Sequence, residues 1–236
     1  GIIHCNTDKI IGTDIFLKFP SVGATQNVIL TAVLAKGVTR IFNAAREPEV
    51  MELCNFLMEA GARICGKGSS YIEIEGVGNL HDVEYTLSPD RIVAGTYMAA
   101  VAAAGGDAVL LDSPVGQIES VIKVLEKIGC KIKTSDEYIK VSCNRRPLPY
   151  DMLKTQPYPG FPTDMQSQLM TVLSLSDGKS TIIEEIFESR YQNAYELKKM
   201  GAKITIEKTQ KKAVISGVKH LEGAGVIAHD LRAGAA

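Results

Sequence analysis

One carboxylate in the sequence stands where it could take part in proton transfer. Asp164 follows Phe-Pro-Thr in the stretch GFPTDMQSQ, residues 160–168, and an apolar run comes after it. An aspartate before such a run predicts a helix N-cap, whose side-chain oxygen accepts a backbone N–H. At the rim of an active site, the same carboxylate could accept the proton of a reacting hydroxyl group. The residues alone leave both interpretations open and favour the N-cap.

A second stretch could bind an anion. FPSVGATQN, residues 19–27, places Ser21 and Gly23 just before a helix whose N-cap we expect at Thr25. The free N–H groups and the dipole of a helix N-terminus attract anions, and glycine lets a phosphate approach the backbone. The stretch is not a P-loop, because it has no Gly-Lys-Ser or Gly-Lys-Thr. A tight turn between strand and helix is the alternative, and it is favoured on this stretch alone.

Arginines stand near two other predicted helix starts. Arg46 lies in NAAREPEV, residues 43–50, and Arg190 lies in FESRYQNAYEL, residues 187–197. The acidic residues and the proline beside Arg46 are typical of a first helical turn. An arginine at such a place could instead pair with a carboxylate or meet a substrate anion.

An internal repeat indicates how these residues are positioned. FLMEAGARI, VLEKIGCKI and ELKKMGAKI each end an amphipathic helix pattern with a glycine and continue as a strand. A glycine there is typical of a left-handed helix C-cap. The three positions are Gly61, Gly129 and Gly201. A predicted β-hairpin follows each of them.

A second and more apolar helix is expected before each amphipathic one, at 24–37, 90–106 and 164–178. A helix that is apolar on nearly every face is typical of burial on all sides. We therefore expect the side chains in the middle of the second helix to be nearly inaccessible, namely Val101, Ala102 and Ala103. Good N-cap residues precede these helices and one further helix start, namely Thr25, Asp90, Asp164 and Asp230.

The repeating unit is strand, buried helix, strand, surface helix, strand, strand. It is expected at about 13–82, 83–153 and 154–224, and a fourth unit begins in GVIAHDLRAGAA. The pattern predicts an α/β (α+β) fold built from repeated β-α-β-α-β-β units. We interpret the chain as part of a longer protein, because it has no initiator methionine and ends inside a unit.

Composition excludes several classes of function. The 236 residues carry 26 basic and 27 acidic side chains, which is not the basic footprint of a nucleic-acid-binding protein. No apolar run approaches the length that spans a bilayer, and the first residues do not resemble a signal peptide. We expect no nucleic acid, no membrane and a cytoplasmic location.

The cysteines and histidines indicate neither a disulfide framework nor a metal site. The five cysteines form no CxxC pair, and the four histidines are scattered. Reduced thiols are the simpler interpretation. Cys54 and Cys130 fall inside apolar patterns and are predicted to be small core residues. We expect no metal and no cofactor.

Six stretches together resemble one family. FPSVGATQN, NAAREPEV, LSPDRIVAGTY, PGFPTDMQSQ, FESRYQNAYELKKMGAKI and HDLRAGAA occur in the order found in UDP-N-acetylglucosamine 1-carboxyvinyltransferases. The resemblance covers essentially the whole chain. It implies an inside-out α/β barrel of six units in two lobes, with the substrate cleft between the lobes.

The resemblance also implies a division of this chain. Residues 1–87 would be the last unit of the first lobe, and 88–236 would be the first two units of the second lobe and the start of a third. We expect the connection near Ser88, because Pro89 biases the residue before it away from helix.

The implied activity is transfer of the enolpyruvyl group of phosphoenolpyruvate to the 3-hydroxyl of UDP-N-acetylglucosamine. The path runs through a tetrahedral phospho-lactoyl intermediate, releases phosphate and opens peptidoglycan synthesis. Two alternatives stay open. One is a shikimate-pathway enolpyruvyl transferase, which acts on shikimate 3-phosphate. The other is a non-catalytic nucleotide-sugar-binding or structural module.

The family's functional residues match this chain in part. Ser21, Val22 and Gly23 match a turn that contacts the nucleotide diphosphate, although Phe19 stands where many members have a lysine. Asp164 matches the carboxylate near the reacting sugar hydroxyl, which is assigned the proton transfer. The other matches are an apolar residue whose backbone touches the sugar and two arginines near the anionic cleft, namely Ile186, Arg190 and Arg232.

Two parts of the family's machinery have no match here. The family's Lys-Asn pair and its loop with a reactive cysteine match no stretch of this sequence, and none of the five cysteines corresponds to the reactive one. We therefore expect no catalysis by this chain alone.

Overall fold

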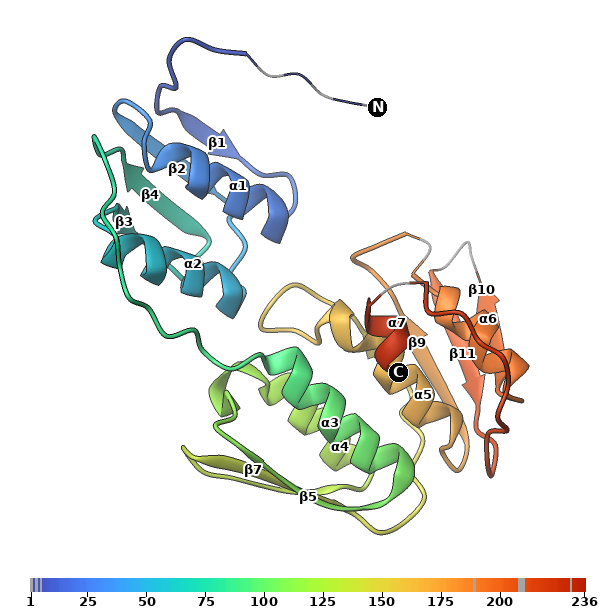
Figure 1. Ribbon diagram of the computed structural model, residues 1–236. Coiled ribbons are helices and arrows are strands. Elements are labelled where there is room, and N and C mark those ends of the chain that lie inside the picture. The colour runs from blue at the N-terminus through green and yellow to red at the C-terminus, as the bar shows by residue number, and fades with distance from the viewer. Residues whose placement is uncertain (1, 3, 5, 189, 208–210, 230) are drawn as a thin grey trace. The chain divides into compact units, whose positions relative to one another are not determined.

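The computed structural model describes residues 2, 4, 6–188, 190–207, 211–229 and 231–236 (Figure 1). The chain divides into two compact units, Gly1–Ser88 and Pro89–Ala236. Each unit has its own hydrophobic core: Ile29, Ile41 and Ile74 belong to the first, Met98 and Leu169 to the second. The boundary falls at Ser88, where the sequence places a connection. The assignment of these units to the lobes of a longer protein stays a prediction.

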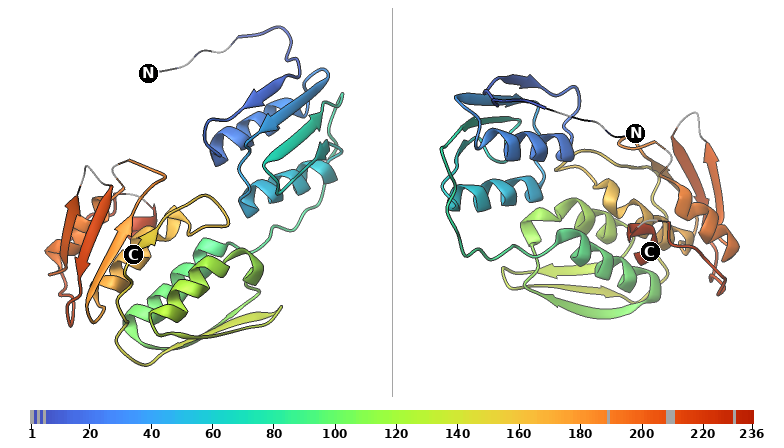
Figure 2. Two further views of the ribbon diagram at one scale, coloured as in Figure 1. Left: turned by 180° about the vertical axis from the view of Figure 1, so that it is seen from behind. Right: turned by 45° about the horizontal axis from the view of Figure 1, so that its top comes forward.

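The first unit contains one complete repeat. Its elements are β1 (Asp14–Phe16), α1 (Val22–Ala32), β2 (Val38–Phe42), α2 (Pro48–Glu59), β3 (Arg63–Cys65) and β4 (Tyr71–Glu75). The sheet order is β1-β2-β4-β3, in which β1 is parallel to β2 and the other pairs are antiparallel. Both helices cover the same face of this sheet (Figure 2).

The second unit contains two further repeats. The first consists of α3 (Arg91–Ala104), β5 (Gly106–Leu111), the short 3₁₀ helix η1 (Val115–Gln117), α4 (Glu119–Lys127), β6 (Lys131–Thr134) and β7 (Tyr138–Cys143). The second consists of β8 (Leu153–Lys154), η2 (Thr163–Met165), α5 (Gln166–Ser174), β9 (Lys179–Ile183), α6 (Gln192–Lys199), β10 (Lys203–Glu207) and β11 (Lys212–Ser216). A final short helix, α7, spans Leu231–Ala235.

The hydrogen-bonding pattern confirms the repeat. The last sheet has the order β10-β11-β9-β8, which is the order of the first sheet read from its other edge, and β8 is parallel to β9 as β1 is to β2. The glycines after the three amphipathic helices, Gly61, Gly129 and Gly201, all have positive φ, as a left-handed C-cap requires.

The middle repeat differs from the prediction in one element. Its sheet has only the three strands β5-β7-β6, and residues 83–90 form no strand in the described structure. The Glu52 carboxylate accepts hydrogen bonds from the backbone N–H and the hydroxyl of Ser88, both at 2.9 Å. A side chain of α2 therefore binds this segment where the other repeats place a strand.

The apolar helices are buried to different degrees. Every residue of α5 except Thr171 is buried. In α3, Ala102 is buried as predicted, whereas Val101 and Ala103 are only half-buried, so the prediction was wrong for these two. The exposed side of α3 is apolar: Val93 is 51% and Tyr97 61% exposed. The physical reason is that α3 packs against α4, α5 and its own sheet, which leaves its opposite face open.

Of the N-caps predicted for α1 and α3, the one for α3 was confirmed and the one for α1 was wrong. Asp90 caps α3, because its Oδ1 accepts from the N–H groups of Ile92 and Val93 at 2.7 and 3.2 Å. The N-cap of α1 is Ser21, not Thr25. Thr25 lies inside the helix, where its hydroxyl donates to the Ser21 carbonyl at 2.8 Å. The predicted cap Asp230 lies outside the described residues.

Candidate functional site

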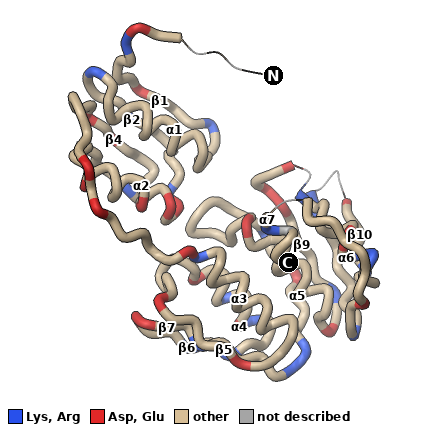
Figure 3. Tube along the Cα trace, viewed as in Figure 1, with Lys and Arg blue, Asp and Glu red and all other residues tan. Residues whose placement is uncertain are grey.

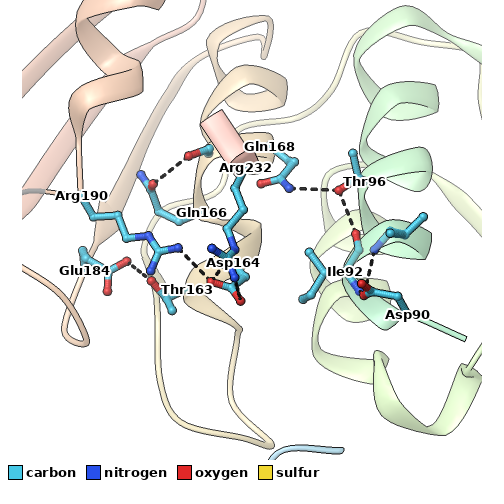
Figure 4. Close-up of polar contacts among 12 residues, drawn as sticks. Asp90, Ile92, Thr96, Thr163, Asp164, Gln166, Gln168, Glu184, Arg190 and Arg232 are labelled. Carbon is cyan, nitrogen blue, oxygen red and sulfur yellow. Dashed lines mark hydrogen bonds and ion pairs between the residues drawn. The ribbon is translucent and has the colours of Figure 1, made fainter. Parts of the chain in front are cut away.

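Asp164 does not cap a helix. It lies in η2, and the N-cap of α5 is Met165, which makes no side-chain hydrogen bond to the helix. The cap prediction for Asp164 was therefore wrong. Figure 4 shows the physical reason: the side chains of Arg190 and Arg232 point at the Asp164 carboxylate, while Asp90 binds the start of its own helix.

Both oxygens of Asp164 accept hydrogen bonds from guanidinium groups. Arg190 Nη2 donates to Oδ1 at 2.8 Å. Arg232 binds with two nitrogens, Nε to Oδ1 at 2.9 Å and Nη2 to Oδ2 at 2.9 Å. The Nη2 contact is a hydrogen bond and the Nε contact is an ion pair; charge-assisted contacts of this kind are among the stronger polar interactions in proteins. The side chains of Arg190, Asp164 and Arg232 are 16%, 24% and 42% exposed, so solvent screens this cluster only in part.

Three separate elements bring these side chains together. Asp164 precedes α5, Arg190 lies in the segment between β9 and α6, and Arg232 lies in α7. Helix α7 packs against α5. The Arg190 guanidinium also lies over the Phe187 ring, 4.7 Å from its centre, which favours one orientation of the arginine. Residues far apart in the sequence therefore form one cationic cluster around one carboxylate.

Glu184 is a buried carboxylate that the sequence did not single out, and it binds the loop that follows β9. Glu184 Oε2 accepts a hydrogen bond from the Thr163 hydroxyl at 2.8 Å. Its Oε1 accepts from the backbone N–H groups of Ile186 and Phe187 at 2.9 and 3.1 Å. Glu184 thus links the residue before Asp164 to the loop that carries Arg190. The only sequence signal was an acidic residue at the end of an apolar strand.

The same carboxylate restricts what Ile186 can offer a ligand. Because the Ile186 N–H is bonded to Glu184, a ligand at this residue would meet its carbonyl group or its side chain. The expected contact between the Ile186 backbone and a sugar therefore depends on the carbonyl oxygen.

Three amide side chains near the start of α5 and α6 are buried, namely Gln166, Gln168 and Asn193. Gln168 Nε2 donates to the Thr96 hydroxyl at 3.0 Å, which ties α5 to α3. Gln166 Nε2 and Asn193 Oδ1 are buried and have no hydrogen-bond partner among the described residues. A buried polar group without a partner costs about 1–3 kcal/mol, so the start of α5 is not built for stability alone.

The residues Ser21, Val22 and Gly23 form a set of their own in the first unit. Ser21 Oγ accepts from the N–H of Ala24 at 3.3 Å and so caps α1. The N–H groups at the first helical positions, Val22 and Gly23, have no acceptor within the helix. A Cβ atom built on Gly23 would meet nothing within 4 Å, so the space beside it is open. This geometry suits an anion at the helix N-terminus.

Arg46 stabilises a turn. Its Nε donates to the carbonyl oxygen of Gly68 at 3.2 Å, in the connection between β3 and β4. Helix α2 begins at Pro48, as the proline predicts. This contact favours a structural role for Arg46.

The described part of the chain lacks the features of a metal site and of a membrane-spanning helix. It contains no group of three or more histidine, cysteine, aspartate or glutamate side chains that could hold a metal ion. None of its helices has the length and apolar character needed to cross a membrane. Acidic and basic residues are interspersed along both units (Figure 3).

Comparison with known families identifies the chain. The family model for EPSP synthase (3-phosphoshikimate 1-carboxyvinyltransferase) matches residues 2–236. The chain belongs to the EPSP synthase family. Within this family, two proteins of Caldanaerobacter subterraneus subsp. tengcongensis are 49% and 48% identical to it, and one of Desulfovibrio desulfuricans is 46% identical. All three are named UDP-N-acetylglucosamine 1-carboxyvinyltransferase.

These EPSP synthase family relatives are longer than the chain. The matches cover 100% of the chain and 56% of each relative, so the chain spans about half of their length. Among solved structures, the enolpyruvyl transferase NikO from Streptomyces tendae matches with a TM-score of 0.78 at 22% identity. That match covers 91% of this chain and 51% of NikO. It confirms the predicted fold class.

Proposed function

We propose that this chain acts within a longer protein that transfers the enolpyruvyl group of phosphoenolpyruvate to the 3-hydroxyl of UDP-N-acetylglucosamine. The observation that carries the proposal is the Asp164 carboxylate, bound by Arg190 and Arg232 at the start of the buried helix α5. The names of relatives that are 46–49% identical support this acceptor over shikimate 3-phosphate. The proposed place is the cytoplasm, at the first step of peptidoglycan synthesis.

Asp164 is the proposed proton acceptor. As the 3-hydroxyl oxygen of the sugar bonds to carbon 2 of phosphoenolpyruvate, the C2–C3 double bond opens and carbon 3 takes a proton from a general acid of the longer protein, while the hydroxyl proton passes to the Asp164 carboxylate. A carboxylate has about four lone-pair positions. Among the described residues, Arg190 Nη2 and Arg232 Nη2 each donate a hydrogen bond to a different oxygen, and Arg232 Nε lies 2.9 Å from Oδ1 in an ion pair. The remaining position on Oδ2 can accept the sugar hydroxyl without breaking either arginine contact.

The arginines have a second proposed role. Two guanidinium groups face one carboxylate, so the cluster of Arg190, Arg232 and Asp164 carries an excess positive charge. Guanidinium groups bind phosphate and carboxylate in a bidentate manner. We assign Arg190 and Arg232 to the phosphate of phosphoenolpyruvate and of the tetrahedral intermediate, while they orient Asp164 for proton transfer.

The diphosphate of the nucleotide sugar is assigned to the first unit. Ser21 can donate its hydroxyl hydrogen while its oxygen still caps α1. Val22 and Gly23 contribute the N–H groups of the first helical turn, and the open space beside Gly23 leaves room for a phosphate. Phe19 supplies no charge there, so the proposed binding of the diphosphate rests on backbone N–H groups and one hydroxyl.

A non-catalytic role is the second candidate for the isolated chain. Its sequence has no match to the family's Lys-Asn pair or reactive cysteine. We propose that the 236-residue chain alone binds the nucleotide sugar weakly at most and releases no phosphate.

Phosphate release tests the proposal. The longer protein is incubated with phosphoenolpyruvate and either UDP-N-acetylglucosamine or shikimate 3-phosphate. The expected result is phosphate release that depends on UDP-N-acetylglucosamine. Turnover with shikimate 3-phosphate alone would contradict the proposed acceptor. Robust turnover by a preparation whose intact mass matches only these 236 residues would contradict the proposed inactivity of the chain.

A further inference from the structure

Two cysteines lie opposite each other across a sheet in the second unit. Cys130 immediately precedes β6, and Cys143 ends β7. The antiparallel register pairs Lys131 with Ser142, so the next pair along the ladder is Cys130 with Cys143. Opposed residues in such a ladder have Cα atoms about 4.5–5.5 Å apart, which lies within the span of a disulfide.

The two thiols are in direct contact. Cys130 Sγ donates a hydrogen bond to Cys143 Sγ at 3.0 Å. Both side chains are buried and both cysteines are free. The backbone therefore already holds the two sulfur atoms as neighbours, and a bond between them would need only a small further approach.

One arginine, Arg145, lies beside this pair. A Cβ atom on Gly129 would lie 2.9 Å from Arg145 Nε, which places the guanidinium beside the residue that precedes Cys130. Burial raises the pKa of the Cys130 thiol and Cys143 raises it further, whereas the positive charge of Arg145 acts in the opposite direction. Cys143 also lines a cavity of about 490 Å³ together with Arg145, Arg146 and Lys219.

Both thiols are buried, so a small reagent needs a local opening of the sheet to reach them. Strand β6 is one of the two edge strands of its three-stranded sheet and, among the described residues, pairs with β7 alone. Edge strands open more readily than central strands because fewer contacts hold them. Opening at the start of β6 would expose Cys130, and the cavity lies against Cys143 on β7.

We propose that Cys130 and Cys143 form a redox-active pair that small-molecule disulfides oxidise to an intramolecular disulfide. In the first step, one cysteine thiolate attacks a sulfur of the reagent R–S–S–R, which forms a mixed disulfide and releases RS⁻. In the second step, the other cysteine attacks the protein sulfur of the mixed disulfide and releases the second RS⁻. The two thiol protons end on two RSH molecules, so the protein loses two electrons and the reagent gains them.

Peptide mapping tests the proposal. The 236-residue chain is incubated with 2-hydroxyethyl disulfide, alkylated after denaturation and digested with trypsin under non-reducing conditions. Trypsin cuts after the lysines between the two cysteines, so the disulfide would join two separate peptides, 128–131 and 141–145. The expected result is this linked pair, which dithiothreitol separates. The exposed Cys65 should carry only the hydroxyethylthio group of the reagent.

Variants separate the pair from the other cysteines. Cys130→Ala should abolish the linked peptides, and Cys54→Ala, at a buried cysteine of the other unit, should leave them unchanged. The proposal is overturned if Cys130 and Cys143 of the wild-type chain are both recovered alkylated, or if each carries its own hydroxyethylthio group. The wild-type map decides the question even if a variant fails to fold.

Discussion

Arg232 binds both oxygens of Asp164, with its Nε and Nη2 atoms each 2.9 Å from a carboxylate oxygen. This contact joins α7, near the end of the chain, to the start of α5. It also removes the simplest structural explanation for the aspartate, because a carboxylate bound to guanidinium groups is not capping the helix that follows. The relationship makes Asp164 the residue on which the proposed function depends most directly.

The first prediction concerns Asp164→Asn in the longer protein. Asparagine keeps the shape of the side chain but loses the negative charge and one of the two acceptor oxygens. We expect the rate of phosphate release to fall by at least about 10²-fold, as for loss of a general base. Steady-state kinetics and thermal melting are measured on the same preparations.

Asp90→Asn is the matched control for that variant. Asp90 is a true N-cap, and asparagine caps a helix about as well as aspartate. The rate and the melting temperature should both stay near wild type. An Asp164→Asn enzyme that is as fast as wild type would reduce Asp164 to a structural ion-pair partner.

The second prediction concerns the geometry of Arg232. Lysine keeps the charge but cannot bind a carboxylate or a phosphate with two parallel hydrogen bonds. Arg232→Lys should lower kcat/KM for phosphoenolpyruvate by about 10-fold, which is the loss of roughly one good hydrogen bond. Arg63→Lys, in an exposed ion pair with Glu75, should leave it unchanged. Equal effects of the two variants would count against a specific role for the Arg232 guanidinium.

The third prediction concerns the turn before α1. Gly23→Ala adds a methyl group that meets nothing within 4 Å apart from its chain neighbours and its own helix backbone, so the protein should fold normally. The methyl group would occupy the space that we assign to a phosphate, and we expect nucleotide-sugar binding by the longer protein to weaken by at least about 10-fold. Isothermal titration calorimetry measures this affinity.

Gly116→Ala is the control for the glycine variant, because a Cβ atom at Gly116 in the second unit also meets nothing within 4 Å. It should bind the nucleotide sugar as tightly as wild type. Unchanged affinity in Gly23→Ala would mean that the diphosphate does not lie against this turn.

The fourth prediction concerns the stability of the second unit. Arg146 donates to the carbonyl oxygens of Leu175, Ser176 and Val218 at 2.8, 2.6 and 2.9 Å. Removing the guanidinium in Arg146→Met leaves these part-buried carbonyl groups without their donor, at a cost of about 2–4 kcal/mol. Urea denaturation of the chain measures the change in the free energy of unfolding.

Lys123→Met is the comparison for Arg146. Lys123 forms an exposed ion pair with Glu119 in α4, and such pairs contribute about 0–1 kcal/mol. If the two variants lose the same small amount of stability, the hydrogen bonds of Arg146 to the carbonyl groups after α5 do not stabilise the second unit as we expect.

Local signals in the sequence were sufficient for the repeat. The alternation of apolar and polar residues depends on helix and strand periods, and the glycines at 61, 129 and 201 are needed because the chain adopts positive φ there. Asp90 could be predicted as a cap because the donors it binds, Ile92 and Val93, are its near neighbours in the sequence. These features involve residues a few positions apart, so the sequence by itself determined them.

Contacts between residues far apart in the sequence were decided only by the tertiary structure. Asp164 has the same local pattern as Asp90, yet it binds Arg190 and Arg232, which lie 26 and 68 positions away. The Cys130–Cys143 contact likewise depends on the register of a hairpin, which a pattern of apolar residues does not specify to one residue. A local pattern reports which hydrogen bonds a side chain could make, whereas the folded chain selects among them by placing stronger partners within reach.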